Sequence, residues 1–289
     1  MFPAPPAPAL VEISEGSLRY EDVIQDGRLL ALALPPTLSY LWRGVLAKHP
    51  GAKGAAQAGV IPILTRLTFA VNEVSVRVDR PIETRSQFEL ARETDAAGAV
   101  TRLFLNVWHE VHGLAGRITP RTPIGPLTLA GQIFAEHTFT RPFAPREQRR
   151  VTSLPGGGYP AVPEAVYAAP AMTTAGDAPD GATWLDELAP DPCEVVFTLD
   201  HSDSNQHVNS LVYVRVFLEA LYRRLAAAGK PVIVTARAVD IAYRKPCFAG
   251  DRVRVQLRLF EHAGVLGAAG FIATEDHKPR CYVRATVAP

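Results

Sequence analysis

At residues 200–213 the chain reads Asp-His-Ser-Asp-Ser-Asn-Gln-His-Val-Asn-Ser-Leu-Val-Tyr. The first ten residues are polar apart from one valine, whereas the segment after them has an apolar stripe at helical spacing. The stripe consists of Leu211, Val214, Leu218, Leu221, Tyr222 and Leu225. The pattern predicts an irregular loop that leads directly into a long buried helix.

Three side chains in this loop carry chemistry suited to acyl transfer. The Asp203 carboxylate or the His207 imidazole can generate an attacking group, and the Asn205 amide can position a carbonyl or a water. The N-terminus of the following helix can stabilise an oxyanion, and we expect the N–H groups of residues 208–210 to be the donors. An ordinary helix cap with an Asx-turn would use the same residue types, so composition alone leaves both interpretations open.

The run Asp203-x-Asn205-Gln206-His207-Val208-Asn209, followed four residues later by Tyr213, resembles the signature of the plant and bacterial acyl-ACP thioesterases. The spacing from Asp203 to Tyr213 is similar to that of the wider hydroxybenzoyl-CoA thioesterase superfamily. The resemblance implies a hot-dog fold, with Asp203 as base or nucleophile and with Asn205 and His207 as positioning residues. It implies substrate-binding roles for Asn209, Tyr213, Arg244 and Cys247, although Asn209 also suits a helix cap.

The resemblance ends at Tyr243-Arg244-Lys245-Pro246-Cys247. The plant enzymes carry a catalytic glutamate at the position of Pro246, and proline can neither activate water nor donate a proton. The catalytic role therefore shifts to Asp203, as in the broader hot-dog thioesterases. Cys247 paired with His207 is an alternative nucleophile, but a free cysteine on a strand is more often a small core residue.

The chain shows two halves with the same order of elements. The second half predicts a strand at 194–199, a helix at 208–228 and strands at 232–243, 252–260, 265–274 and 281–287. The first half predicts a strand at 29–34, a helix at 36–49 and strands at 61–78, 87–93, 100–111 and 127–139. One long helix with an antiparallel sheet in each half is an α+β layout, and with the resemblance it predicts a double hot-dog of two tandem units.

The predicted domains follow from these halves. Residues 1–12 form a flexible tail, 13–140 a degenerate, acyl-binding hot-dog unit, 141–192 a Pro/Gly-rich linker and 193–289 the catalytic hot-dog unit.

His109 and His112 lie three apart on a predicted strand and so face opposite sides, which argues against a metal site. We interpret them as surface residues.

Composition fits a cytoplasmic enzyme of 289 residues with 47% hydrophobic residues and a net charge of +1. Three cysteines are too few for a disulfide framework, and the charge gives no support for nucleic acid as partner. No apolar run is long enough for a membrane span.

We expect a monomer or homodimer that needs neither metal nor cofactor and acts on a thioester of acyl carrier protein or coenzyme A. Two alternatives remain open: a non-catalytic acyl-thioester-binding protein, and a hot-dog dehydratase, which requires a histidine facing the acid.

Overall fold

The computed structural model describes residues 2–5, 11–119 and 123–289, and it divides into two compact units. Unit 1 comprises Met1–Leu29, Ala33–Thr65 and Val71–Ala169, and unit 2 comprises Leu30–Leu32, Arg66–Ala70 and Pro170–Pro289. The proline-rich stretch predicted as a linker is thus divided between the two units. Each unit is described by itself below.

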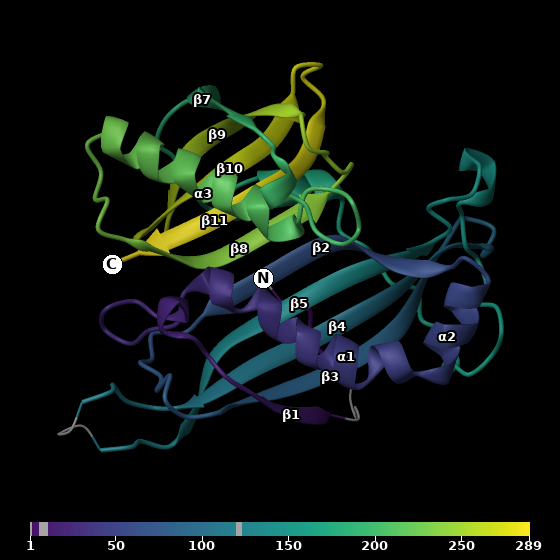
Figure 1. Ribbon diagram of the computed structural model, residues 1–289. Coiled ribbons are helices and arrows are strands. Elements are labelled where there is room, and N and C mark those ends of the chain that lie inside the picture. The colour runs from purple at the N-terminus through teal and green to yellow at the C-terminus, as the bar shows by residue number, and fades with distance from the viewer. Residues whose placement is uncertain (1, 6–10, 120–122) are drawn as a thin grey trace. The chain divides into compact units, whose positions relative to one another are not determined.

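Unit 2 packs one long helix, α3, on an antiparallel sheet (Figure 1). Its elements are β6 (Thr183–Trp184), β7 (Ala189–Val196), α3 (Ser210–Ala227), β8 (Thr235–Tyr243), β9 (Arg252–His262), β10 (Val265–Thr274) and β11 (Pro279–Ala288). The strand order is β8-β11-β10-β9, with β6 and β7 pairing on the free side of β9. Residues Arg66–Ala70 of β2 pair with β8.

The sequence pattern explains how unit 2 forms. Alternate residues of β9 are fully buried, and the apolar stripe of α3 supplies the opposite side of the same core. The buried stripe residues include Val214, Phe217, Leu218, Leu221 and Leu225. The predicted helix and its four following strands are confirmed. The helix begins at Ser210, two residues later than predicted, because Asn209 is its N-cap.

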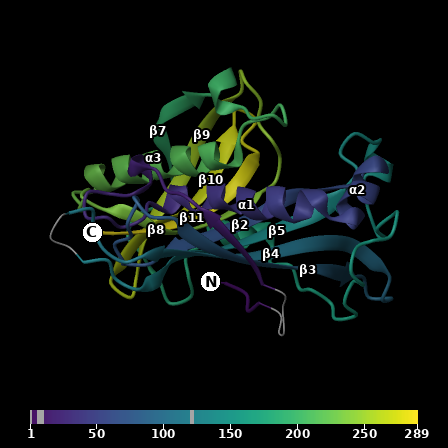
Figure 2. The same ribbon diagram turned by 60° about the horizontal axis from the view of Figure 1, so that its bottom comes forward.

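Unit 1 has the same kind of layout with two shorter helices (Figure 2). Its elements are β1 (Glu12–Gly16), α1 (Leu38–Gly44), α2 (Pro50–Gln57), β2 (Ile61–Val71, of which Arg66–Ala70 are counted with unit 2), β3 (Ile82–Thr94), β4 (Val100–Leu114) and β5 (Leu127–Thr140). The strand order is β1-β3-β4-β5-β2, and the pairs from β1 through β5 are antiparallel.

Two predictions for the first half were wrong. The expected strand at 29–34 is a bridge at Leu29 followed by 3-10 turns at Ala31–Ala33 and Pro35–Thr37. A short apolar run does not by itself distinguish a strand from a buried helical turn. The expected helix at 36–49 is broken into a 3-10 turn, α1 and another 3-10 turn at Leu46–Lys48. The helix α2 that follows contains two glycines, at positions 51 and 54, which lowered its helical signal.

The surface interpretation of His109 was also wrong. His109 is 1% exposed, whereas His112 points to the other side of β4 and contacts Glu110 at 2.9 Å. The Thr37 hydroxyl donates to a backbone carbonyl at 2.6 Å, so it accepts from His109 Nε2 at 2.8 Å. Ser86 Oγ then donates to His109 Nδ1 at 2.7 Å. The ring is therefore a neutral core residue that joins the start of α1 to β3 and β4.

This buried histidine predicts a pH-dependent stability. Burial lowers the pKa of His109 to about 4, so between pH 6.5 and 4 the unfolded chain binds a proton that the folded chain does not. The contribution of His109 to the free energy of unfolding is fully present above pH 6.5. It declines as the pH falls toward 4, by up to about 3 kcal/mol. Urea unfolding across this pH range checks the slope. His109→Gln should reduce the slope to the part that other groups contribute, chiefly the buried His137, whose pKa is also lowered to about 4. His262→Gln, at the half-buried end of β9, is the control and should leave the slope nearly unchanged; equal slopes in all three proteins would contradict the prediction.

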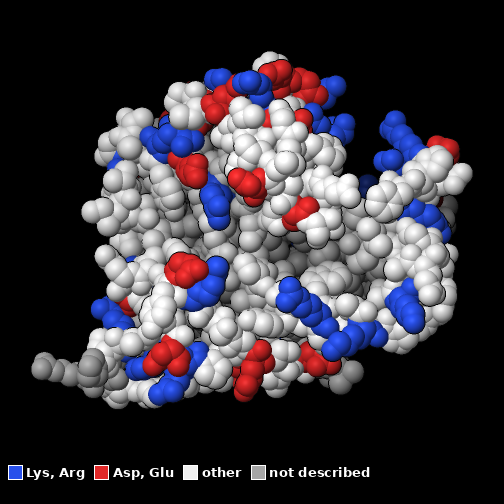
Figure 3. All heavy atoms as spheres, in the orientation of Figure 1, with Lys and Arg blue, Asp and Glu red and all other residues white. Residues whose placement is uncertain are grey.

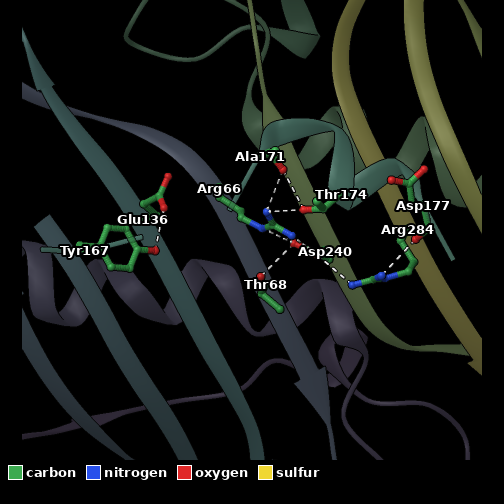
Figure 4. Close-up of polar contacts among 9 residues, drawn as sticks. All are labelled: Arg66, Thr68, Glu136, Tyr167, Ala171, Thr174, Asp177, Asp240 and Arg284. Atoms are coloured by element: carbon green, nitrogen blue, oxygen red, sulfur yellow. Dashed lines mark hydrogen bonds and ion pairs between the residues drawn. The ribbon is translucent and has the colours of Figure 1, made fainter. Parts of the chain in front are cut away.

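A buried ion-pair network centred on Asp240 ties the segment before β6 to the sheet of unit 2 (Figure 4). The Asp240 carboxylate accepts from Arg66 Nε and Nη2 at 2.8 and 2.5 Å, from Thr68 at 3.0 Å and from Arg284 at 3.1 Å. Arg66 also donates to Thr174, in the 3-10 turn Met172–Gly176. These bonds hold the 3-10 turn Met172–Gly176 against β8 and β11.

A second buried carboxylate belongs to unit 1. Glu136 accepts from the hydroxyls of Thr65 and Tyr167, both at 2.8 Å. Figure 4 shows Tyr167 directed at Glu136. This contact anchors the end of the unit 1 portion of the proline-rich stretch on β5.

The predicted tail, residues 1–12, lies partly outside the described residues. Within the described part, Pro3 accepts a hydrogen bond from the Trp108 indole at 2.9 Å, and β1 begins at Glu12. No helix among the described residues has the length and apolar character needed to cross a membrane. Within residues 2–5, 11–119 and 123–289, no group of three or more His, Cys, Asp or Glu side chains is arranged to hold a metal ion.

Candidate active site

The polar run of unit 2 forms a closed loop between the 3-10 turn Leu199–His201 and α3. Ser202 and Val208 form an antiparallel bridge across its base. Inside the bridge, the Asp203 N–H donates to the His207 carbonyl at 3.1 Å. The predicted irregular loop is confirmed, and its closure holds Asp203 and His207 opposite each other across a tight turn.

Asp203 has a hydrogen-bond donor on each carboxylate oxygen. Oδ1 accepts from the Asn205 N–H at 2.8 Å, and Oδ2 accepts from the Asn209 side-chain amide at 3.1 Å. The residue is half-buried. Because each oxygen keeps a free lone pair, the carboxylate is held in one orientation and can still accept a proton or a further hydrogen bond.

Asn209 links this carboxylate to the helix. Its Oδ1 accepts from the Leu211 N–H at 2.9 Å, which is the N-cap of α3, while its Nδ2 donates to Asp203. Its own N–H donates to the His201 carbonyl at 2.8 Å. Asn209 therefore both caps the helix and orients Asp203.

The hydrogen bond of His207 fixes which ring nitrogen carries the proton. Nδ1 lies 3.2 Å from the Val208 carbonyl oxygen, which can only accept, so Nδ1 is protonated in the neutral ring. Nε2 then carries a lone pair. His207 is half-buried, and this nitrogen is available as a base or acceptor.

Asn205 and Gln206 form the exposed tip of the loop. Gln206 has a φ of 65°, in the left-handed region that few non-glycine residues adopt. The Asn205 side-chain amide has no hydrogen-bond partner among the residues that the structure describes. It is free to contact a bound molecule.

Tyr213 and Cys247 lie beneath the loop. The Tyr213 hydroxyl accepts from the Cys247 N–H at 2.7 Å, and the Cys247 carbonyl accepts from the Val208 N–H at 2.9 Å. Tyr213 is 3% exposed and Cys247 is 0% exposed. The backbone of Cys247 thus joins α3 to the end of the loop.

The burial of Cys247 argues against it as the nucleophile. Removal from water raises the pKa of the thiol, so the reactive thiolate is disfavoured. Of the three free cysteines, Cys247 and Cys281 are buried and only Cys193 is exposed.

Arg244 and Tyr243 complete the surroundings. Arg244 is exposed at the end of β8, and its guanidinium donates to the Pro279 carbonyl at 3.2 Å. Sequence reasoning gave no role to Tyr243, whose hydroxyl donates to the Ser210 carbonyl at 3.1 Å and whose ring lies 6.0 Å from that of Tyr213. Tyr243 lies two residues after the buried Ile241 on the same strand, so the two side chains face the same side of the sheet. This spacing was the sequence signal that could have placed Tyr243 next to α3.

The predicted oxyanion donors are mostly occupied. The Val208 N–H donates to Cys247 and the Asn209 N–H donates to His201. Among the described residues, the Ser210 N–H has no acceptor. Of the three predicted donors, only the first N–H of α3 is therefore free to bind an oxyanion.

His109 has both ring nitrogens engaged by Thr37 and Ser86 within the core of unit 1. At 1% exposure it cannot serve as an accessible acid or base. His109 therefore does not supply the accessible histidine that the dehydratase alternative requires.

Solved structures resemble the chain over nearly its whole length. A protein assigned as an oleoyl thioesterase from Lactobacillus plantarum superposes with a TM-score of 0.64 at 14% identity, covering 97% of each chain. An acyl-ACP thioesterase from Bacteroides thetaiotaomicron gives 0.61 at 13% identity, covering 96% of this chain and 98% of the other. The chain has the acyl-ACP thioesterase fold.

The 12:0-ACP thioesterase from Umbellularia californica has the same fold, with a TM-score of 0.54 at 13% identity and 96% of each chain covered. By sequence, the chain matches no protein-family model and no curated protein. At 13–14% sequence identity these structures share the fold with this chain, but they do not assign roles to its individual residues. The roles of the loop residues are therefore argued from their own geometry.

Proposed function

We propose that this chain is an acyl thioesterase that hydrolyses an acyl-ACP or acyl-CoA to a free carboxylic acid and a thiol. The observation that carries the proposal is the Asp203 carboxylate, fixed by Asn205 and Asn209 at the N-terminus of α3 with a free lone pair on each oxygen. The shared fold with solved thioesterases supports the same class of reaction.

We further propose that the two units are tandem hot-dogs, with unit 1 degenerate and acyl-binding and unit 2 catalytic. The strand that follows the helix lies next to the fourth strand in both units, giving the orders β2-β5-β4-β3 and β8-β11-β10-β9. The same connectivity in both halves supports an internal duplication. Within the ten residues before the first α-helix of each unit, only unit 2 carries acidic side chains, those of Asp200 and Asp203.

In the proposed reaction Asp203 accepts a proton from a water whose oxygen bonds to the thioester carbonyl carbon. The Ser210 N–H faces the resulting oxyanion, and Asn205 orients the water or the substrate carbonyl. The carbon–sulfur bond then breaks, and the thiolate takes up the proton that Asp203 or His207 Nε2 has held. The products are a carboxylic acid and a free thiol, so one water is consumed.

Asp203 can instead attack the carbonyl itself and form an acyl anhydride, which water then opens. A single turnover in ¹⁸O-labelled water detects an anhydride that water opens at the aspartate carbonyl. Label found in the Asp203 carboxylate shows that water opened an anhydride at the aspartate, whereas a base transfers label to the product alone. Mass spectrometry of the peptide containing residue 203 gives the answer directly.

The remaining predicted residues support the site. Tyr213 and Cys247 hold the loop against α3, and the exposed Arg244 is placed to meet a phosphate. Acyl carrier protein and coenzyme A both present a phosphopantetheine arm, so Arg244 suits either carrier. Comparing matched acyl chains on the two carriers identifies the substrate.

Thiol release from acyl-CoA and acyl-ACP substrates of graded chain length tests the function. Hydrolysis with equal amounts of acid and thiol is the expected result. Tight binding of the thioester without turnover would instead indicate a non-catalytic binding protein, and hydration of an enoyl thioester would indicate a dehydratase.

The dual role of Asn209 yields a separable prediction. Asn209→Ser keeps a good N-cap but is too short to reach Asp203, so kcat/KM should fall about tenfold while thermal stability changes little. Asn209→Ala removes both contacts and should also lower stability by about 1 kcal/mol. Thiol-release kinetics and thermal unfolding measure the two effects, and full activity in Asn209→Ser would show that Asp203 does not depend on this amide.

A further inference from the structure

A basic loop projects from the end of β5 in unit 1 (Figure 1). Residues 141–150, here called the arginine loop, read Arg-Pro-Phe-Ala-Pro-Arg-Glu-Gln-Arg-Arg. Four arginines against one glutamate give the loop a charge of +3. Phe143 is 96% exposed, the highest value among the exposed large apolar residues described.

The loop is ordered by its own hydrogen bonds. The Arg141 N–H and the Thr140 hydroxyl both donate to the Arg149 carbonyl at 3.0 Å, and Thr140 forms an antiparallel bridge with Arg150. A 3-10 turn at Arg146–Gln148 closes the tip. The exposed phenylalanine is therefore presented on a preorganised loop, since Pro142 and Pro145 also restrict its backbone.

The charges of the arginine loop are not neutralised internally. Arg149 Nε donates to the Ala144 carbonyl at 2.9 Å and Arg150 Nε to the Thr101 carbonyl at 2.8 Å. Carbonyls hold the side chains without cancelling their charge. Among the ion pairs of the described residues, none involves Arg141, Arg146, Arg149 or Arg150.

The neighbouring surface changes this balance little. The start of β4, which Arg150 contacts at Thr101, and the paired end of β3 carry Glu93, Asp95 and Arg102, a sum of −1. The combined charge is still +2, and Arg102 already pairs with Glu93 at 3.6 Å. In Figure 3, blue guanidinium groups with one red carboxylate cover the loop that projects at the upper right.

We propose that the arginine loop docks the protein reversibly on an anionic phospholipid surface. The guanidinium groups match phosphate oxygens in a bidentate geometry, and basic residues near an anionic leaflet each add to the attraction. Phe143 inserts its ring at the boundary between headgroups and acyl chains. A lone phenylalanine exposed on all sides suits a fluid interior better than a shaped protein pocket, which would contact a broader apolar patch.

Sedimentation with vesicles tests the proposal on the full-length protein, independently of any hydrolytic activity. The protein should bind vesicles of phosphatidylcholine with phosphatidylglycerol, should not bind pure phosphatidylcholine, and should be released by added salt. Phe143→Ser should weaken binding about tenfold, because an inserted aromatic side chain is lost. Arg146→Gln/Arg149→Gln should weaken it by about tenfold or more, whereas Arg146→Lys/Arg149→Lys, which keeps the charge, should retain most of it.

Matched variants elsewhere on the chain serve as controls. Tyr20→Ser removes another exposed aromatic residue, which is 76% exposed, and Arg43→Gln/Arg215→Gln removes the same charge from two exposed helical sites. Neither should alter vesicle binding. Binding that is absent, equal on neutral vesicles, or reduced as much by the controls would overturn the proposal. Loop-dependent binding of an acidic protein without vesicle binding would assign the loop to a protein partner instead.

Discussion

Replacing Asp203 with asparagine is expected to lower kcat/KM for thioester hydrolysis by about 10²–10⁴-fold, the range typical for loss of a general base. Asparagine has nearly the same shape and can still accept from the Asn205 N–H through its amide oxygen. It cannot take a proton from water or attack a carbonyl. The loss should therefore appear in kcat, with little change in thermal stability.

Two comparisons make this result specific. Cys247→Ala should keep most of the activity, because that thiol is buried and protonated. His207→Gln should lower activity less than Asp203→Asn, since it removes a helper at Nε2 and leaves the carboxylate in place. Full hydrolysis by Asp203→Asn, together with loss in Cys247→Ala, would replace the carboxylate mechanism with a thiol one.

Replacing Asp240 with alanine is expected to lower the free energy of unfolding by about 3–5 kcal/mol, the usual cost of breaking a buried ion pair from one side. The side chain of Asp240 is 3% exposed, and those of Arg66 and Arg284 are 10% and 15% exposed. Without the carboxylate, two guanidinium groups remain in the protein with no counter-charge. Urea unfolding at neutral pH measures the effect.

The ion pair between Arg252 and Glu194 is the matched control because its side chains are 54% and 35% exposed. Glu194→Ala should change the free energy of unfolding by less than about 1 kcal/mol. If Asp240→Ala were no more destabilising than Glu194→Ala, the buried network would have no net stabilising role. Catalytic activity of the folded fraction should be unaffected by either change.

Much of unit 2 could be predicted from its sequence because its pattern is regular. The alternation through β9 has period 2, and the predicted strand 265–274 has the bounds of β10. Unit 1 was harder to predict. The start of β3 places Thr84 and Ser86 on its buried face, and small polar residues hide the alternation that marks a strand.

In the candidate site, too, some features could be predicted from the sequence and others could not. The loop from Asp203 to Asn209 is short, so its residue types and spacing predicted an irregular turn and a helix cap. Contacts made over long sequence separations could not be predicted. Cys247 meets Tyr213 across 34 residues, and His109 meets Thr37 across 72. Such partners follow from strand register, which one sequence specifies only indirectly.

The burial of two of the three cysteines has a practical consequence for experiments on this chain. A maleimide reagent should attach to Cys193 alone under native conditions, because Cys247 and Cys281 have no accessible sulfur. Cys193 lies on β7, which pairs with β9, and β9 is separated from β8 by β10 and β11. The unmodified protein therefore carries a natural attachment point for a fluorophore or spin label, remote in sequence from the arginine loop.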